Sequence, residues 1–576
     1  MATNVLGLED LSRSRARPVE HDTLLHETKE VSDLTHSSAF RRRSIATLAG
    51  AATISLALVG CAAGDSGDEL SLDGIIVGTT DPVTSLDPAG SYDNGSFAVQ
   101  TQVFPFLFNS PYGSPDVEPD IAVSGEFTAP TEFTVVLKDG LTFANGNELT
   151  ASDVKFTFDR TVALDDPNGP SSLLGNLDSV EAVDDTTVVF TLKAANDQTF
   201  EQILSSPAGP IVDEEVFSAD SLTDPADIVE GNAFGGQYSI TDYTQNEIIQ
   251  YEANPNYDGL LGAAKTESVT TQYFADETSL KLAVQEGDVD VAYRSLSPTD
   301  VEDLRGDDGV TVWDGPGGEI RYIVFNFNTQ PFGAETPEAD PAKALAVRQA
   351  VASVVDRTEV SEQVYNGTYV PLYSYVPEGL TGATESLKGL YGDGDGNPDV
   401  DKATALLEDA GVETPVALNL QYSPDHYGAS SDDEYAAYAS QLNDSGLFEV
   451  NLESTLWDVY SAERREDAYP LYQLGWFPDY SDADNYLTPF FSDENFLGNH
   501  YQDSAVNELI QQQLVEDDEA ARTQLIEDIQ DAVASQLSTL PLLQGAGVAV
   551  TGTDIAGADD TLDASFKFRY AALTRE

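Results

Sequence analysis

The sequence predicts an α/β protein with mixed sheets and two or three domains. Strand-like and helix-like patterns alternate along both halves of the chain, which is typical of α/β folds. The chain has 576 residues, too many for one hydrophobic core. Apolar residues make up 41% of it, within the range of globular proteins. We therefore expect several globular domains.

The first 60 residues predict an export signal preceded by a long leader. Three arginines, Arg41–Arg43, stand before an uncharged apolar run, Ser44–Gly60. This run is shorter than the ~20 residues of a usual membrane span, and a positive flank with a short apolar core is typical of secretory signals. Leu58-Val59-Gly60-Cys61 resembles a bacterial lipobox, which implies cleavage before Cys61 and a lipid on its sulfur. The alternative is a single-pass anchor.

The chain after this signal is strongly acidic. The net charge is −73, and residues 1–60 contribute none of it because their basic and acidic side chains balance. Such a surface repels nucleic acid, so we expect no nucleic-acid partner. Residues 61–73 are small, polar and acidic after the cysteine and predict a lipid tether. The predicted lipid tether places the mature protein on the outer face of the cell membrane. We expect it to be a monomer.

Scarce cysteine and histidine argue against catalysis and metal binding. Cys61 is the only cysteine, and after the leader only His426 and His500 remain. This excludes an intramolecular disulfide and weakens any zinc site or Ser-His-Asp system. The segment 393–397, DGDGN, looks like a calcium loop, but Pro398 and Thr404 replace the glycine and glutamate of an EF-hand. We expect a solvated loop there, no metal, no cofactor and no catalytic residues.

The expected elements follow from local patterns. Short apolar runs predict strands. A Ser, Thr or Asp just before apolar residues at helical spacing predicts the start of a helix. Strands are expected at 74–79, 133–138 and 289–292. Helices are expected to begin after Thr150, Asp276 and Asp399, and to cover 344–355 and 504–536.

Four segments, in this order, carry a family resemblance. They are FTVVLKDGLTFANGNELTASDVKFTFDR at 133–160, Gly236-Gln237-Tyr238 with YEANPNY at 251–257, Val347-Arg348-Gln349-Ala350 with Asp356-Arg357, and LGWFPDY at 474–480. Together they resemble the family-5 extracytoplasmic solute-binding proteins, the oligopeptide- and dipeptide-binding group of ABC importers. The match spans nearly all of the mature chain.

The resemblance implies a two-lobe, periplasmic-binding-protein-like fold of type II with an extra subdomain and a hinge. We expect a first lobe at 74–322 with an inserted subdomain at about 117–232, a second lobe at 323–540, and a return to the first lobe at 541–576. The two chain crossings are expected near 322–327 and 540–543. Two lobes of this kind close on a ligand and expel water from it.

The segment 474–480 is the expected ligand site. In peptide-binding members, the acid of its motif pairs with the peptide's α-ammonium, and here that acid is Asp479. Backbone groups of Gly475, Trp476 and Phe477 are expected to bond the peptide as an added strand, with Trp476 as a wall and Tyr480 beside them. The alternative is that Trp476 and Tyr480 are core aromatics. Pro478 removes one backbone donor, and 422–428 supplies no arginine for a ligand carboxylate.

The expected function is therefore solute capture without catalysis. The protein would bind peptides, most simply oligopeptides, and deliver them to an ABC permease and ATPase complex in the membrane. The alternatives are the same fold with a non-peptide solute, such as an oligosaccharide or metal chelate, a secreted glycosidase with a carboxylate pair, and a surface adhesin or receptor.

Overall fold

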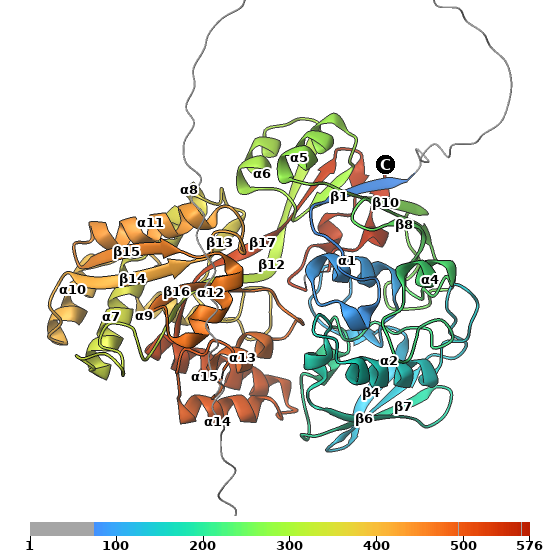
Figure 1. Ribbon diagram of the computed structural model, residues 1–576, viewed down its shortest axis with the longest axis horizontal. Helices are drawn as coiled ribbons and strands as arrows, with labels where there is room; N and C mark the ends of the chain where they lie inside the picture. The colour runs from blue at the N-terminus through green and yellow to red at the C-terminus, as the bar shows by residue number, and fades with distance from the viewer. Residues whose placement is uncertain (1–73, 494, 566) are drawn as a thin grey trace, which may run out of the picture. The chain divides into compact units, whose positions relative to one another are not determined.

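The structure is a computed structural model that describes residues 74–493, 495–565 and 567–576 (Figure 1). The predicted leader and signal at 1–60, the lipidation site Cys61 and the tether at 61–73 lie outside the described residues. Within the described part of the chain, no helix is both long enough and apolar enough to span a membrane.

The strands confirm the predicted mixed α/β class. One 11-stranded sheet combines parallel and antiparallel pairs. Its order is β15 (Phe448–Ser454), β14 (Val416–Tyr422), β16 (Leu471–Trp476), β12 (Val310–Phe325), β17 (Thr539–Gly552), β11 (Val291–Tyr293), β1 (Ile75–Thr79), β10 (Ser268–Tyr273), β9 (Ile248–Ala253) and β8 (Tyr238–Thr244), and β13 (Tyr369–Pro371) pairs with β17. The predicted strand at 74–79 is β1, and the one at 289–292 overlaps β11.

Two long antiparallel strands, β12 and β17, join two separate hydrophobic cores. Ile320–Phe325 of β12 and Leu540–Leu543 of β17 belong to one core cluster, which also receives β14 and β16. The other ends of the same strands, with Trp313 and Ala549, pack against a second cluster. We call the part of the chain around Trp313 and Ala549, together with the segment 117–232, the first lobe. The part around Tyr322 and Leu540 is the second lobe. Figure 1 shows the strand pair running from one lobe into the other.

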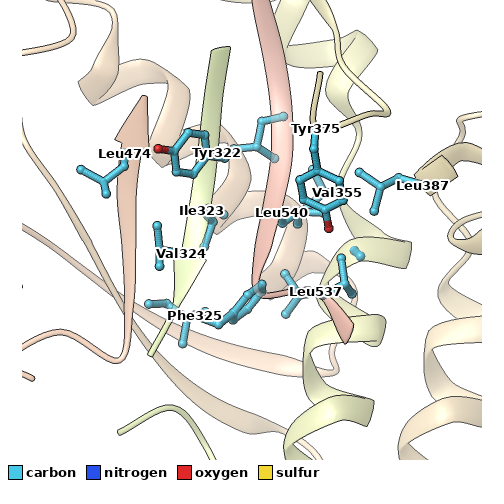
Figure 2. Packing of buried hydrophobic residues seen from close by; sticks show 14 of the residues in the cluster. Tyr322, Ile323, Val324, Phe325, Val355, Tyr375, Leu387, Leu474, Leu537 and Leu540 are labelled. Atoms are coloured by element: carbon cyan, nitrogen blue, oxygen red, sulfur yellow. The ribbon is translucent and has the colours of Figure 1, made fainter. Parts of the chain in front are cut away.

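Figure 2 shows how the second lobe holds its half of this strand pair. Tyr322 pairs with Leu474 of β16 in the sheet register, and their side chains lie together. Leu540 of β17 lies among side chains from outside the sheet, including Tyr375 and Leu387. All of these side chains are buried. The strands are therefore fixed by packing on both sides of the sheet in this lobe.

The strand pair passes between the lobes through glycines. The register of β12 against β17 shifts between Pro316 and Ile320. A Cβ at Gly317 would lie 2.3 Å from the carbonyl oxygen of Gly545 and 3.1 Å from the amide nitrogen of Gly547. Only glycine allows these backbones to approach so closely. We place the crossings here, a few residues before 322–327 on β12 and after 540–543 on β17.

A second sheet lies within the segment expected to form the inserted subdomain. Its antiparallel order is β4 (Ala122–Ala129), β5 (Glu132–Leu137), β7 (Thr187–Leu192) and β6 (Leu177–Ala182). A third core cluster covers it, drawing also on Leu107, Phe108 and Ile211. Two short pairs complete the strands: β2 (Phe108–Asn109) with β3 (Glu118–Pro119), and β18 (Ile555–Ala556) with β19 (Thr574–Arg575). The predicted strand at 133–138 is β5.

Three helices begin where the sequence predicts them, and the helix expected at 344–355 begins three residues earlier, at Pro341. Thr150 and Asp153 form a capping box at the start of α2, Asp276 caps α5 and Asp399 caps α10. The helices of the described residues are α1 (Asn94–Val103), α2 (Ala151–Leu164), α3 (Phe200–Ile203), α4 (Pro225–Glu230), α5 (Glu277–Glu286), α6 (Pro298–Arg305), α7 (Pro341–Val354), α8 (Arg357–Gln363), α9 (Ser386–Leu390), α10 (Val400–Asp409), α11 (Ser431–Asp444), α12 (Trp457–Glu463), α13 (Thr488–Phe491), α14 (Ser504–Gln513) and α15 (Glu519–Gln536).

The predicted helical region 504–536 is wrong in one respect, because it is two helices. The chain breaks between α14 and α15, and the Asp518 carboxylate accepts a hydrogen bond from the Ala521 amide at 2.9 Å. An aspartate that caps a new helix competes with continuation of the preceding one. The carbonyl of Leu514, freed at this break, accepts a bond from the Gln198 amide of the first lobe.

We predict that Gly317→Ala destabilises the protein by about 1–3 kcal/mol, because the added methyl group has no space between two backbones. Gly389→Ala is the matched control: Gly389 lies in α9, and a Cβ there would meet no atom within 4 Å. Alanine is favoured over glycine in a helix, so this variant should be as stable as the parent or more so. Thermal unfolding followed by circular dichroism measures both. Equal melting of the two variants would contradict the close approach at the crossing.

Candidate functional site

A cavity of about 980 Å³ is lined by both lobes. The first lobe contributes the segments 80–81 and 92–97 and the loop 294–298 before and at the start of α6. The second lobe contributes 475–479, which follows from the end of β16, and 426–430, which precedes α11. The volume suits a ligand of small-molecule or short-peptide size. The end of β16 therefore faces the space where a ligand can be enclosed.

Four of the five predicted ligand residues line this cavity: Gly475, Trp476, Phe477 and Asp479. A Cβ at Gly475 would lie 2.8 Å from the ring of Tyr427 and 3.0 Å from the carbonyl of Ile320. Glycine is thus required for β16 to pack under Tyr427. The segment also has an open edge: β14 pairs with Leu471 and Tyr472 only, whereas β12 follows β16 to Trp476.

Asp479 is held by one residue from each lobe. Its carboxylate accepts a hydrogen bond from the hydroxyl of Tyr92, which lies in the first lobe just before α1. It also accepts a bond from the side-chain amide of Asn485 at 3.1 Å. The side-chain oxygen of Asn485 in turn accepts bonds from the Asp479 amide at 2.9 Å and the Trp476 indole at 2.8 Å. Asn485 thereby fixes both the wall and the acid of the predicted site.

The electrostatics of Asp479 follow from its position in the cleft. Burial raises the pKa of the Asp479 carboxyl, and the bonds from Tyr92 and Asn485 partly oppose this shift. Burial and the facing carboxylate raise the pKa of the Tyr92 hydroxyl. Among the residues that the structure describes, Asp479 forms no ion pair with a basic side chain. A partly desolvated carboxylate in this state favours a cationic partner, because unpaired buried charge is costly.

Tyr480 is the predicted ligand residue that the described lining does not include. Its ring packs against the third core cluster, which covers the second sheet in the first lobe. Its hydroxyl donates to the Asp484 carboxylate at 3.3 Å. The side chain therefore joins the lobes beside the cavity. Its position two residues after Pro478 does not reveal this, because the contact depends on tertiary packing.

An aromatic wall that the sequence did not predict lies beside the site. His426 and Trp457 both line the cavity and stack with ring centroids 3.6 Å apart and an interplanar angle of 3°. Burial lowers the pKa of His426 to about 4, so the ring is neutral near pH 7. From the sequence alone, His426 can be either a ligand contact or an exposed loop residue. Its stacking partner lies 31 positions further along the chain and gives no local signal.

Arg321 occupies the wall between Gly475 and the aromatic residues. It pairs with Gly475 in the strand register, and its guanidinium lies 4.6 Å from the ring centre of Tyr369. Two carboxylates flank it, Glu319 at 3.1 Å and Glu434 at 3.4 Å. Burial opposes its charge, yet the neighbouring tyrosines and these carboxylates raise the pKa of Arg321 above its usual value.

The described residues contain no group of three or more acids, histidines or cysteines arranged to hold a metal ion. In the loop 393–397, the Asp393 carboxylate accepts bonds from the amides of Asp395 and Asn397. These bonds form a tight turn before Asp399, which caps α10. The solvated-loop interpretation agrees with this arrangement.

We predict that Asn485→Ala disturbs the site, because it leaves the Trp476 indole and the Asp479 amide without partners. Each buried polar group left unpaired costs about 1–3 kcal/mol. The variant should melt at lower temperature and change its tryptophan fluorescence. Asn451→Ala removes an exposed amide on β15 with two side-chain bonds of its own and should change neither property. Identical behaviour of the two variants would show that Asn485 does not organise the segment.

Comparison with known proteins gives the family. The profile of the bacterial extracellular solute-binding proteins, family 5, matches residues 116–498. The probable D,D-dipeptide-binding periplasmic protein DdpA of Escherichia coli is 24% identical over 482 residues, covering 82% of this chain and 88% of its own. The dipeptide-binding protein DppE of Bacillus subtilis is also 24% identical, over 527 residues, covering 85% of this chain and 91% of its own.

Solved structures share the fold. The ABC transporter substrate-binding protein CtaP of Listeria monocytogenes superimposes with a TM-score of 0.73 at 23% identity, covering 87% of this chain and 99% of its own. The periplasmic binding protein DppA of Helicobacter pylori, in complex with the peptide STSA, superimposes with a TM-score of 0.67 at 19% identity. The match covers 87% of this chain and 98% of the DppA chain. The present chain thus has the fold of the periplasmic binding proteins. It belongs to the bacterial extracellular solute-binding proteins of family 5.

Proposed function

We propose that this protein captures peptides outside the cell and delivers them to the permease and ATPase of an ABC importer. The observation that carries the proposal is the carboxylate of Asp479 on the cavity wall, three residues after the open end of β16. A carboxylate that can accept an α-ammonium, next to backbone able to accept an added strand, matches the two features that all peptides share. Several relatives named for dipeptide binding support the same class of ligand.

The main-chain part of the recognition would use the end of β16. Residues Leu474–Trp476 have β12 on one side and extend beyond the pairing with β14 on the other, whereas the Gln473 carbonyl already accepts a hydrogen bond from the Tyr460 hydroxyl at 2.6 Å. A peptide added there gains main-chain hydrogen bonds without contact to its side chains. Pro478 has no amide hydrogen, so the added strand would end at this point and leave its ammonium at Asp479.

The proposed cycle needs closure and no chemistry. The ligand would displace water between the lobes, and bending at the glycine crossings of β12 and β17 would bring the walls together. The ammonium would join or replace the Tyr92 hydroxyl at Asp479. Ligand released to the permease would leave unchanged, so the purified protein should not convert it.

We predict that Asp479→Asn weakens peptide binding by roughly a hundredfold or more, because an unpaired ammonium in a closed cleft costs about 3–5 kcal/mol. The parent protein should bind the N-acetylated form of the same peptide poorly, and the variant should lose little further on acetylation. Calorimetry on the four combinations measures the coupling. If mutation and acetylation each cost their full amount independently, Asp479 is not the partner of the ammonium.

We also propose that Cys61 carries the lipid that holds the protein to the membrane. The motivation is Leu58-Val59-Gly60-Cys61 after a short apolar run. Cys61→Ser should block lipid attachment and move the protein from the membrane fraction to the soluble fraction. Fractionation of cells expressing each form, followed by mass spectrometry of the mature amino terminus, measures this. A serine variant that remains in the membrane fraction would favour an uncleaved anchor instead.

A further inference from the structure

The wall of the cavity contains a buried charge cluster that is not neutral by itself. Glu319, Arg321 and Glu434 are each less than a tenth exposed, at 7%, 4% and 0%. Arg321 forms ion pairs with both carboxylates. One guanidinium therefore serves two carboxylates, and the cluster has a formal charge of −1 when all three are ionised. Buried charge without a partner is unfavourable.

Arg321 has no donor left for a ligand. Its Nε donates to Glu319 at 3.2 Å. Its two terminal nitrogens donate to the hydroxyls of Tyr365 and Tyr369, both at 2.9 Å, to Glu434 at 3.4 Å and to the carbonyl of Tyr427 at 2.5 Å. These contacts use all five N–H groups of a guanidinium. Arg321 is therefore a fixed part of the wall and not a receptor for a ligand carboxylate.

The two tyrosines extend the same pattern. The hydroxyl of Tyr369 accepts from Arg321 and donates to Glu319 at 2.7 Å. The hydroxyl of Tyr365 likewise accepts from Arg321 and donates to Glu434 at 2.8 Å. Both carboxylates are thereby held in place around one cation. These bonds tie both buried carboxylates to Arg321 through its two tyrosine partners.

The two carboxylates differ in their access to a ligand. Glu319 lines the cavity, whereas Glu434 lies behind Arg321, and the other oxygen of Glu434, Oε1, is buried with no hydrogen-bond partner among the described residues. A carboxylate has about four acceptor positions, and Glu319 accepts two hydrogen bonds, one from Nε of Arg321 and one from the Tyr369 hydroxyl. Acceptor positions of Glu319 therefore remain for a group in the cavity.

We infer that Glu319 is a second anchoring acid of the cavity, and that the protein selects peptides that carry a lysine or arginine side chain. The inference rests on the proposed peptide function: Asp479 would hold the α-ammonium, and Glu319 would hold the cationic end of a side chain. A ligand cation at Glu319 brings the cluster to neutrality. The stacked pair of His426 and Trp457 in the same wall supplies an apolar surface for the alkyl part of that side chain.

One feature of the surroundings agrees with a cationic ligand. Burial lowers the pKa of His426 to about 4, so this ring adds no positive charge to the wall near neutral pH. Burial raises the pKa of Glu434, and the charge of Arg321 opposes that shift.

Calorimetry with matched tripeptides tests the inference. Trialanine is compared with the three peptides that carry one lysine at each position, and with the three that carry norleucine, which has the same alkyl chain without the charge. For at least one position, lysine should bind at least about tenfold more tightly than norleucine, since a hydrogen bond to a charged group contributes about 1.4 kcal/mol or more. Glutamate at that position should bind more weakly than norleucine.

Three variants locate the effect. Glu319→Gln keeps the shape of the side chain and one of its two acceptor oxygens but removes the charge, so the preference for lysine should fall most. Glu434→Gln lies behind the wall and cannot touch the ligand, yet it also makes the cluster neutral and should reduce the preference. Glu385→Gln removes an exposed acid paired with Lys388 outside the cavity and should leave the preference unchanged. Thermal unfolding of each variant checks its fold.

The outcomes separate the inference from the proposed function. If trialanine and norleucine peptides bind but lysine gives no gain at any position in the parent protein, the inference is wrong and the peptide function stands. A lysine preference that Glu319→Gln leaves intact also overturns it, because the cation then lies elsewhere. If no peptide of the set binds, the proposed function fails and the inference fails with it.

Discussion

The strand pair of β12 and β17 is the constraint on which the rest of the structure depends. It is the part of the large sheet that belongs to two hydrophobic cores at once, with Tyr322 and Leu540 in one and Trp313 and Ala549 at the other. Between these anchors, Gly317 lies against Gly545 and Gly547 with no room for a side chain. The two lobes are thus joined by two strands whose ends are packed in hydrophobic cores. Between these ends, the strands carry glycines and therefore no side chains.

The cavity follows from this arrangement. Because β16 pairs with β12 up to Trp476, the segment 475–479 emerges beside the crossing and faces the first lobe. Asp479 can therefore meet Tyr92, a residue 387 positions away. Arg321 and Glu319 lie on β12 itself, next to the same crossing. The residues that can contact ligand are those that the strand pair brings to the boundary between the two cores.

Local sequence was enough to predict much of this. Capping aspartates and the capping box of Thr150 and Asp153 mark where three helices start. These starts could be predicted because each cap bond joins residues within four positions of one another. The gap between α14 and α15 was missed because an acidic run reads equally well as a helix surface or a new cap. The motif at 474–480 predicts a ligand site, which stays a prediction, and the cavity includes four of its five predicted residues. Tyr480 and the Arg321 cluster depend on contacts between distant segments, which a single sequence does not contain. Asn485 contacts residues only six and nine positions earlier, but no sequence motif marks it.

A crystal structure of the protein with a bound peptide would locate the ligand against Asp479 and β16. We expect the peptide's α-ammonium within hydrogen-bond distance of the Asp479 carboxylate, and its main chain bonded directly to the backbone of residues 474–477. A peptide bound in the cavity with its ammonium away from Asp479 and no backbone bonds to this segment would contradict this expectation.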